Sequence, residues 1–366
     1  MPDPAKKRVL IVDDSAVMRT LLRSVLAPEP WLEVATTAAD GQAALIAVSE
    51  FKPDLVLLDV EMPVMDGLAT LRALRARGCA IPVIMCSSLT HRGARVTIEA
   101  LADGASDYVT KPVNAADRNA AVTSLRADLI PRIRALIRSS PKPQAVAPPR
   151  RSANQTQPEI VVIGVSTGGP AALEHLLPKL PASFPVPLLV VQHMPELFTS
   201  LLAERLNGRC ALRVTEATEG ATVSAGNIVV ARGNWHLEVV RAIREGEKPS
   251  LHLHQGPVEN YCRPAVDVLL RSVATVYGAS ALTVILTGMG NDGLVGARRL
   301  SALGGVVIAQ DAATSTVWGM PGAIVNAGIA DCVLPIETIA AELLRRVAQS
   351  GTSDLGFDRW AVQVGR

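Results

Sequence analysis

The chain has 366 residues, 49% of them hydrophobic but only 3% aromatic, and a formal net charge of +2. This length suffices for two globular domains, each with its own core. The absence of a long basic block and the scarcity of aromatic side chains argue against nucleic acid as a partner.

The amino-terminal residues and the cysteines indicate where the protein works. The apolar run after the first residues is short and ends in two aspartates, so we expect no signal peptide and no membrane insertion. Five cysteines without a C-x-x-C pair argue against a disulfide framework or a thiolate metal site. A cytoplasmic location is therefore expected.

In the first part of the chain, short apolar runs alternate with segments of helical spacing. The apolar runs are 9–12, 55–58 and 83–86, and helical spacing follows at 17–26, 68–74 and 96–101. Such alternation is typical of βαβ units and a parallel sheet. We expect a doubly wound α/β domain over residues 1–138.

A Pro-rich polar stretch without hydrophobic periodicity, residues 139–157, is predicted to be a linker. Strand-like runs then resume at 160–163, 188–192, 228–231, 283–286 and 306–309. These runs predict a second α/β domain over residues 158–350, followed by a tail, 351–366. The two halves show no close repeat, so two different parallel-sheet domains are expected.

Polar side chains follow the predicted strands of the first domain. Asp13 and Asp14 follow one strand, Asp59 the next, and Ser87 and Lys111 two more. Ligands bind beyond the carboxyl ends of parallel strands, so these groups should converge. Clustered carboxylates suit Mg²⁺, and a lysine with a hydroxyl can bind a phosphoryl group. One such aspartate alone would more simply be a helix cap.

Residues 8–126 resemble the response-regulator receiver domain through the motifs "VDDS", "LLDVEMP", "MCSSLT" and "YVTKPV". The resemblance implies a flavodoxin-like fold, with Asp59 phosphorylated by a histidine kinase. It also implies a Mg²⁺ site made by Asp14, Asp59 and the Glu61 backbone carbonyl, with Asp13 acting through water. Lys111 would pair with the phosphate, and Ser87 with Tyr108 would form the switch.

The second domain opens with "IVVIGVSTGGP", in which Ser166 lies between glycines. The stretch matches G-x-S-x-G in a strand, turn and helix context, as a nucleophile elbow requires. A phosphate-binding loop is an alternative, although G-x-G-x-x-G and G-K-[ST] are both missing. A simple helix cap is the other alternative, and the motif alone favours it.

Two further residues change this balance. His193 follows the next predicted strand, and Asp292 follows another, so all three would lie at the same edge of one parallel sheet. Each residue alone would more often be structural. The order Ser, His, Asp differs from that of α/β-hydrolases, which indicates a convergent triad on another topology.

Residues 159–348 resemble the CheB family of chemotaxis protein-glutamate methylesterases, through "IGVSTGGP", "QHMPELFT", "VVARGNWHLEV", "CRPAVDVLL", "ILTGMGNDG" and "WGMPGAI". The resemblance implies a Rossmann-like three-layer domain with Ser166 as nucleophile, His193 as general base and acid, and Asp292 as its orienting partner. Methyl-accepting chemotaxis receptors would be the substrates, with glutamine deamidation as a second activity. No cofactor is expected in the esterase site.

Other assignments are less specific. The backbone amides of Thr167 and Met289 are candidates for an oxyanion hole, and Arg263 is a possible contact for acidic substrate helices. Cys262 lacks a partner histidine at a recognisable spacing, so we interpret it as a packing residue. A phosphorylation-controlled binding module with unused catalytic residues, and a dinucleotide-binding domain, remain as alternative functions.

Overall fold

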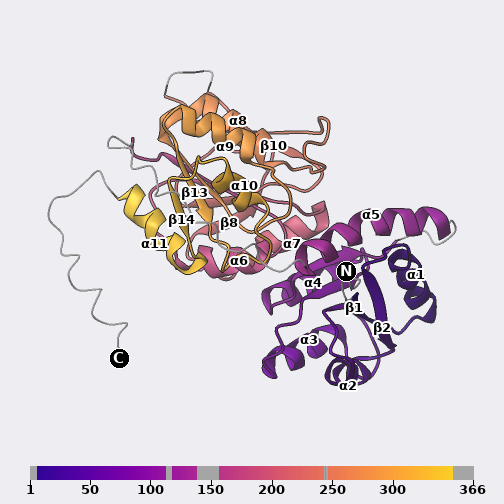
Figure 1. The fold of residues 1–366 in the computed structure, drawn as a ribbon. Helices are drawn as coiled ribbons and strands as arrows, with labels where there is room; N and C mark the ends of the chain where they lie inside the picture. Colours follow the sequence, from indigo (N-terminus) through magenta and orange to yellow (C-terminus); the bar gives the residue numbers. More distant parts are fainter. Residues whose placement is uncertain (1–5, 113–117, 138–155, 243, 245, 349–366) are drawn as a thin grey trace, which may run out of the picture.

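The computed structural model describes residues 6–112, 118–137, 156–242, 244 and 246–348. These residues form two α/β units that lie side by side (Figure 1). The predicted linker, except for residues 156 and 157, and the predicted tail lie outside the described residues.

The first unit is a five-stranded parallel sheet in the order β2-β1-β3-β4-β5. Four of its helices begin with an N-cap residue whose side chain accepts a hydrogen bond from a backbone amide of the first turn. These residues are Ser15, Asp40, Asp66 and Thr90. The strands are β1 (Lys7–Val12), β2 (Leu32–Ala38), β3 (Leu55–Asp59), β4 (Val83–Ser87) and β5 (Asp107–Thr110), and the helices are α1 (Ala16–Leu26), α2 (Gly41–Phe51), α3 (Gly67–Ala76), α4 (His91–Ala102) and α5 (Arg118–Ile137).

The second unit is a seven-stranded parallel sheet in the order β14-β13-β12-β6-β7-β9-β8. Its strands are β6 (Ile160–Val165), β7 (Leu188–Gln192), β8 (Arg213–Glu216), β9 (Asn227–Val230), β12 (Ala281–Ile285), β13 (Val306–Gln310) and β14 (Cys332–Leu334). Its helices are α6 (Gly169–Leu176), α7 (Glu196–Asn207), α8 (Val266–Tyr277), α9 (Leu294–Ala302), α10 (Met320–Asn326) and α11 (Ile336–Val347). The same unit contains a separate two-stranded antiparallel sheet, formed by β10 (His236–Val240) and β11 (Ser250–His254).

Alternation along β6 explains why this sheet is covered on both faces. Ile160 and Val162 belong to the core on one face, whereas Val161 and Ile163 belong to the core on the other. All four are fully buried, as expected for a strand between two helical layers. The prediction of two parallel α/β domains is confirmed.

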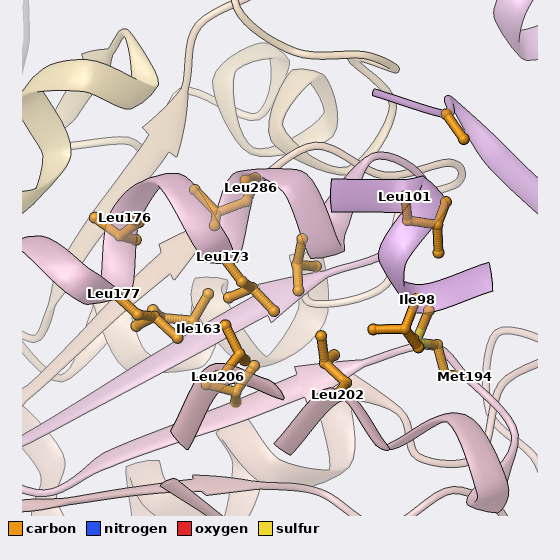
Figure 2. Packing of buried hydrophobic residues seen from close by; sticks show 14 of the residues in the cluster. Ile98, Leu101, Ile163, Leu173, Leu176, Leu177, Met194, Leu202, Leu206 and Leu286 are labelled. Atoms are coloured by element: carbon orange, nitrogen blue, oxygen red, sulfur yellow. The ribbon is translucent and has the colours of Figure 1, made fainter. Parts of the chain in front are cut away.

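The two units pack against each other through α4 and α7. Ile98 and Leu101 of α4 belong to the same apolar cluster as Met194 and Leu202 of the second unit (Figure 2). Burial of these side chains from both units favours association. The first unit therefore lies against the end of the second sheet that carries the serine motif.

Candidate active site

The carboxylates of the first unit converge as predicted from their positions at the strand ends. Oxygens of Asp13, Asp14 and Asp59 lie within 4.8 Å of one another. Lys111 Nζ lies 2.7 Å from Asp13 Oδ2 and 2.7 Å from Asp59 Oδ1. The hydroxyl of the buried Ser87 donates to the Ser88 carbonyl at 3.1 Å.

This cluster has the donor chemistry of a Mg²⁺ site. Asp13 and Asp59 are almost fully buried, and Asp14 is exposed beside them. Burial raises the pKa of Asp59 to about 6, although Lys111 acts in the opposite direction. A divalent cation would remove the cost of keeping these carboxylates ionised, and Mg²⁺ prefers such oxygen ligands. The Glu61 carboxylate turns to Arg92, at 3.4 Å.

Ser166 lies on a sharp turn between β6 and α6. Its amide donates to the Thr287 carbonyl at 3.0 Å, and its carbonyl accepts from the Gly169 amide at 2.8 Å. Gly168 has φ of 78°, and a Cβ there would lie 2.4 Å from Thr316 Oγ1, so glycine is required. The turn holds Ser166 at the carboxyl edge of the sheet.

His193 and Asp292 meet at this edge because β7 and β12 flank β6. His193 Nε2 lies 2.8 Å from Asp292 Oδ2, so Nδ1 is the ring nitrogen that this pair leaves available. Ser166, His193 and Asp292 line one cavity of about 650 Å³. In the described part of the chain, the Ser166 hydroxyl itself donates no hydrogen bond.

The hydrogen-bond donors around Asp292 stabilise its ionised form. The first amides of α8, on Val266 and Asp267, donate to it at 2.6 and 3.0 Å, and Asn260 Nδ2 donates at 2.9 Å. Burial alone would raise the pKa of Asp292, but the bond to His193 and these amides hold it below its usual value. Sequence reasoning missed Asn260, because no local motif links it to Asp292.

The ionised Asp292 in turn affects the histidine. Burial lowers the pKa of His193, but contacts with Asp292 and the Cys262 thiol outweigh burial and raise that pKa to about 10. Asp292 thus favours the protonated form of His193, as the acid of a catalytic triad would. The interpretation of Cys262 as a packing residue is incomplete, because its thiol touches the histidine ring and lines the same cavity.

Two amides beside Ser166 are available for an oxyanion. Among the described residues, neither the Thr167 amide nor the Met289 amide donates a hydrogen bond. A Cβ at Gly288 would lie 2.8 Å from Ser166 Cβ, which shows how closely the segment before Met289 approaches the serine. Free amides next to a candidate nucleophile are what an oxyanion hole needs.

Arg263 has most of its hydrogen-bonding capacity committed within the protein. Its guanidinium donates to Asn234 Oδ1 and to the carbonyls of Gln255 and Gly256, at 2.7 to 3.3 Å. Arg263 therefore holds the loops around the site together. Its contact with substrate stays a prediction. His236 is buried in β10 and bonds the Pro257 carbonyl at 2.9 Å, so its role here is structural.

The first unit forms one wall of the serine cavity. Leu101, Asp107, Tyr108 and Arg132 line that cavity together with Ser166. Thr167 Oγ1 donates to the buried Asp107 Oδ2 at 2.7 Å, and Arg132 Nε lies 3.3 Å from the same oxygen.

Tyr108 joins the two units next to this contact. Its ring stacks on Phe198 of α7, with 4.6 Å between centroids. The ring is buried, and it lies on the same strand as Asp107. A residue predicted as part of the phosphoryl switch therefore touches the second unit directly.

Fold and site together define a class: a serine-hydrolase arrangement on a parallel sheet, packed against a unit with a phosphoacceptor-type carboxylate cluster. Residues 161–343 match the CheB methylesterase family, and residues 9–123 match the response regulator receiver domain. The chain belongs to the CheB methylesterase family and carries a receiver domain in front of the catalytic domain.

Relatives are similar over nearly the whole chain. A protein-glutamate methylesterase/protein-glutamine glutaminase of Trichodesmium erythraeum is 46% identical over 352 residues, covering 93% of this chain and 99% of that protein. One of the same name from Nocardioides is 46% identical over 358 residues, covering 94% and 97%. The Thermotoga maritima CheB methylesterase catalytic domain is 43% identical with a TM-score of 0.50, covering 52% of this chain and 99% of that domain.

Proposed function

We propose that this protein hydrolyses glutamate methyl esters on chemotaxis receptors with Ser166, His193 and Asp292, and that phosphorylation of Asp59 activates it. The observation that carries the proposal is the shared cavity, in which His193 and Asp292 form a 2.8 Å pair beside a serine on the sharp turn after β6. Family membership and the relatives' names support protein glutamate as the substrate and glutamine deamidation as a second reaction.

The chemistry follows from these groups. Ser166 Oγ attacks the ester carbonyl as His193 takes its proton, and amides of Thr167 and Met289 receive the developing oxyanion. The ester bond breaks, and methanol leaves with the proton from His193. Water, deprotonated by His193, then hydrolyses the acyl-enzyme to glutamate and restores the serine. Glutamine would follow the same course and release ammonia.

The pKa of His193 predicts how the reaction depends on pH. Only the neutral ring accepts the serine proton, and a group with a raised pKa becomes neutral only at higher pH. We expect kcat/KM for a small ester to rise between pH 6 and 9. Asp292→Asn should lower kcat by about 10³-fold to 10⁴-fold. It should also shift the rise of kcat/KM to lower pH, because the pKa of His193 falls when its partner is no longer charged. If the pH dependence of kcat/KM were the same in the variant and in wild type, Asp292 would not be the residue that raises the pKa of His193.

Control by the receiver is supported by its contacts with the catalytic domain. Asp107 and Tyr108 on β5 bind Thr167 and Phe198, and β5 ends beside Lys111, which pairs with Asp59. A phosphoryl group on Asp59, given by a histidine kinase, would recruit Lys111 and disturb this strand. The receiver would then release the cavity, and the Ser166 hydroxyl could turn to His193.

The Asp107 contact offers a direct test of this control. We expect Asp107→Ala to raise the rate without phosphodonor by about tenfold, because a buried hydrogen bond stabilises the docked state by about 1.5 kcal/mol. Asp128→Ala is the matched control, since it removes another partner of Arg132 but leaves Thr167 bound. Equal rates in both variants would argue against the contact.

Mg²⁺ is proposed for the receiver, held by Asp14, Asp59 and the Glu61 carbonyl, with Asp13 through water. When bound, the ion would neutralise the carboxylates and the incoming phosphoryl group. Asp59 supplies the attacking oxygen, and Lys111 is placed to bind the transferred phosphoryl oxygens.

The test of the function is methanol release from methyl-esterified receptor fragments, with and without a small phosphodonor. We expect a slow basal rate that the phosphodonor increases. Tight binding of the esterified fragments without methanol release would favour a binding module. None of the described helices has the length and hydrophobicity to cross a bilayer.

A further inference from the structure

A tight turn beside the active site carries a tyrosine at its tip. The Glu259 amide donates to the Cys262 carbonyl at 3.1 Å, and the Cys262 amide donates back at 2.8 Å. Asn260 and Tyr261 are thus the two central residues of a hairpin turn, with φ of 51° and 62°. Positive φ at both positions is the pattern of a type I′ turn, which strongly favours glycine at the second.

Tyrosine at that position is unfavourable for folding. A bulky residue in the left-handed region is strained, and such strain concentrates at functional sites. Among the described residues, five other than glycine have positive φ, and three of them line cavities at this site: Asn234, Asn260 and Tyr261. Most of the strained backbone positions therefore lie around the serine cavity and the cavity beside it.

The turn is held rigidly on the catalytic carboxylate. Asn260 Nδ2 donates to Asp292 Oδ1 at 2.9 Å and to Asp267 Oδ2 at 3.1 Å. Glu259 forms a bidentate ion pair with Arg271 at 2.6 and 2.8 Å. The position of Tyr261 is thereby fixed relative to the triad.

The Tyr261 side chain has no packing role. Its exposed fraction is 101%, the highest among the large hydrophobic residues described. Within the described residues its hydroxyl makes no hydrogen bond, and its ring contacts no other aromatic ring. It lines both the serine cavity and a neighbouring cavity of about 770 Å³ between the domains. Neither domain packing nor folding accounts for the ring.

We propose that Tyr261 is a substrate-binding residue, on which a helix of the protein substrate packs while its esterified glutamate enters the serine cavity. A tyrosine on a rigid turn offers a large amphipathic contact and loses little conformational entropy on binding. The inference rests on the proposed function for the identity of the substrate. Beyond the proposed function, the inference identifies a surface outside the serine cavity with which the enzyme recognises a protein substrate.

The decisive variant is Tyr261→Gly, in which the turn keeps its conformation and loses the ring. With phosphodonor present, we expect KM for esterified receptor fragments to rise about tenfold, with kcat within twofold of wild type. We expect no decrease in three other quantities: the rate with a small chromogenic ester, the ratio of the rates with and without phosphodonor, and the thermal unfolding midpoint. Lys52→Gly, at a left-handed residue in the receiver, is the matched control and should leave KM unchanged.

A binding measurement separates this inference from the proposed function. Esterified fragments are titrated into Ser166→Ala with and without Tyr261→Gly, where a tenfold weaker Kd is expected for the double variant. Weaker binding would support the inference even if wild type released no methanol. An unchanged KM and Kd, or a parallel loss with the small ester, would overturn it.

Discussion

Ser166→Ala is expected to abolish methanol release from esterified receptor fragments, with a fall in kcat of at least about 10⁴-fold. Ser166 stands on the turn between β6 and α6, and the amides of Thr167 and Met289 beside it donate no hydrogen bond within the described residues. Its loss removes the atom that forms the acyl-enzyme, whereas substrate binding uses other contacts. The measurement is methanol release at saturating substrate and phosphodonor.

The nearby Thr199→Ala variant serves as a control for the assay. Thr199 is buried on α7 and donates to Glu216 at 2.7 Å, and it does not line the serine cavity. Its substitution should lower stability but preserve turnover of the folded protein. Ser166→Ala should in addition keep its thermal unfolding midpoint, because the Ser166 contacts that hold the turn are made by its backbone. Residual turnover near the wild-type rate would exclude Ser166 as the nucleophile.

Asp59→Asn is expected to eliminate phosphate uptake and the whole stimulation by phosphodonor, while the basal esterase rate remains. Asp59 lies at the end of β3 with its oxygen 2.7 Å from Lys111 Nζ, and the amide cannot form an acyl phosphate. The basal rate persists because the catalytic residues belong to the other domain. Phosphate incorporation and esterase rate should be followed together.

A matched control for this variant is Asp54→Asn. Asp54 precedes the same strand, pairs with Lys7 at 3.0 Å and lies at the opposite end of the sheet from the carboxylate cluster. It should incorporate phosphate and respond normally, and chelation of divalent cations should stop uptake in both wild type and control. Labelled Asp59→Asn protein, or stimulation without label, would rule out Asp59 as the phosphoacceptor.

Most of the fold follows from local pattern. Predicted apolar runs correspond to β1, β3, β4, β6, β7, β9, β12 and β13, since strands buried on both faces are continuous hydrophobic segments. β5 was expected because Lys111 was predicted to follow a strand, whereas β8 and β14 went unpredicted. β8 has only one fully buried residue, and the short β14 is only half-buried, so neither has a strong sequence signal.

The sequence predicted that Ser166, His193 and Asp292 would lie at one edge of the sheet, because residues that follow parallel strands share that edge. The three residues meet because the strand order places β7 and β12 on either side of β6, and this order became known only from the tertiary structure. Only the tertiary structure decided what surrounds them. Asn260 reaches Asp292, and Asp107 reaches Thr167 from another domain, through contacts between residues 32 and 60 positions apart. Such contacts depend on how sheets and loops pack, and that packing leaves no periodic or local signature in the chain.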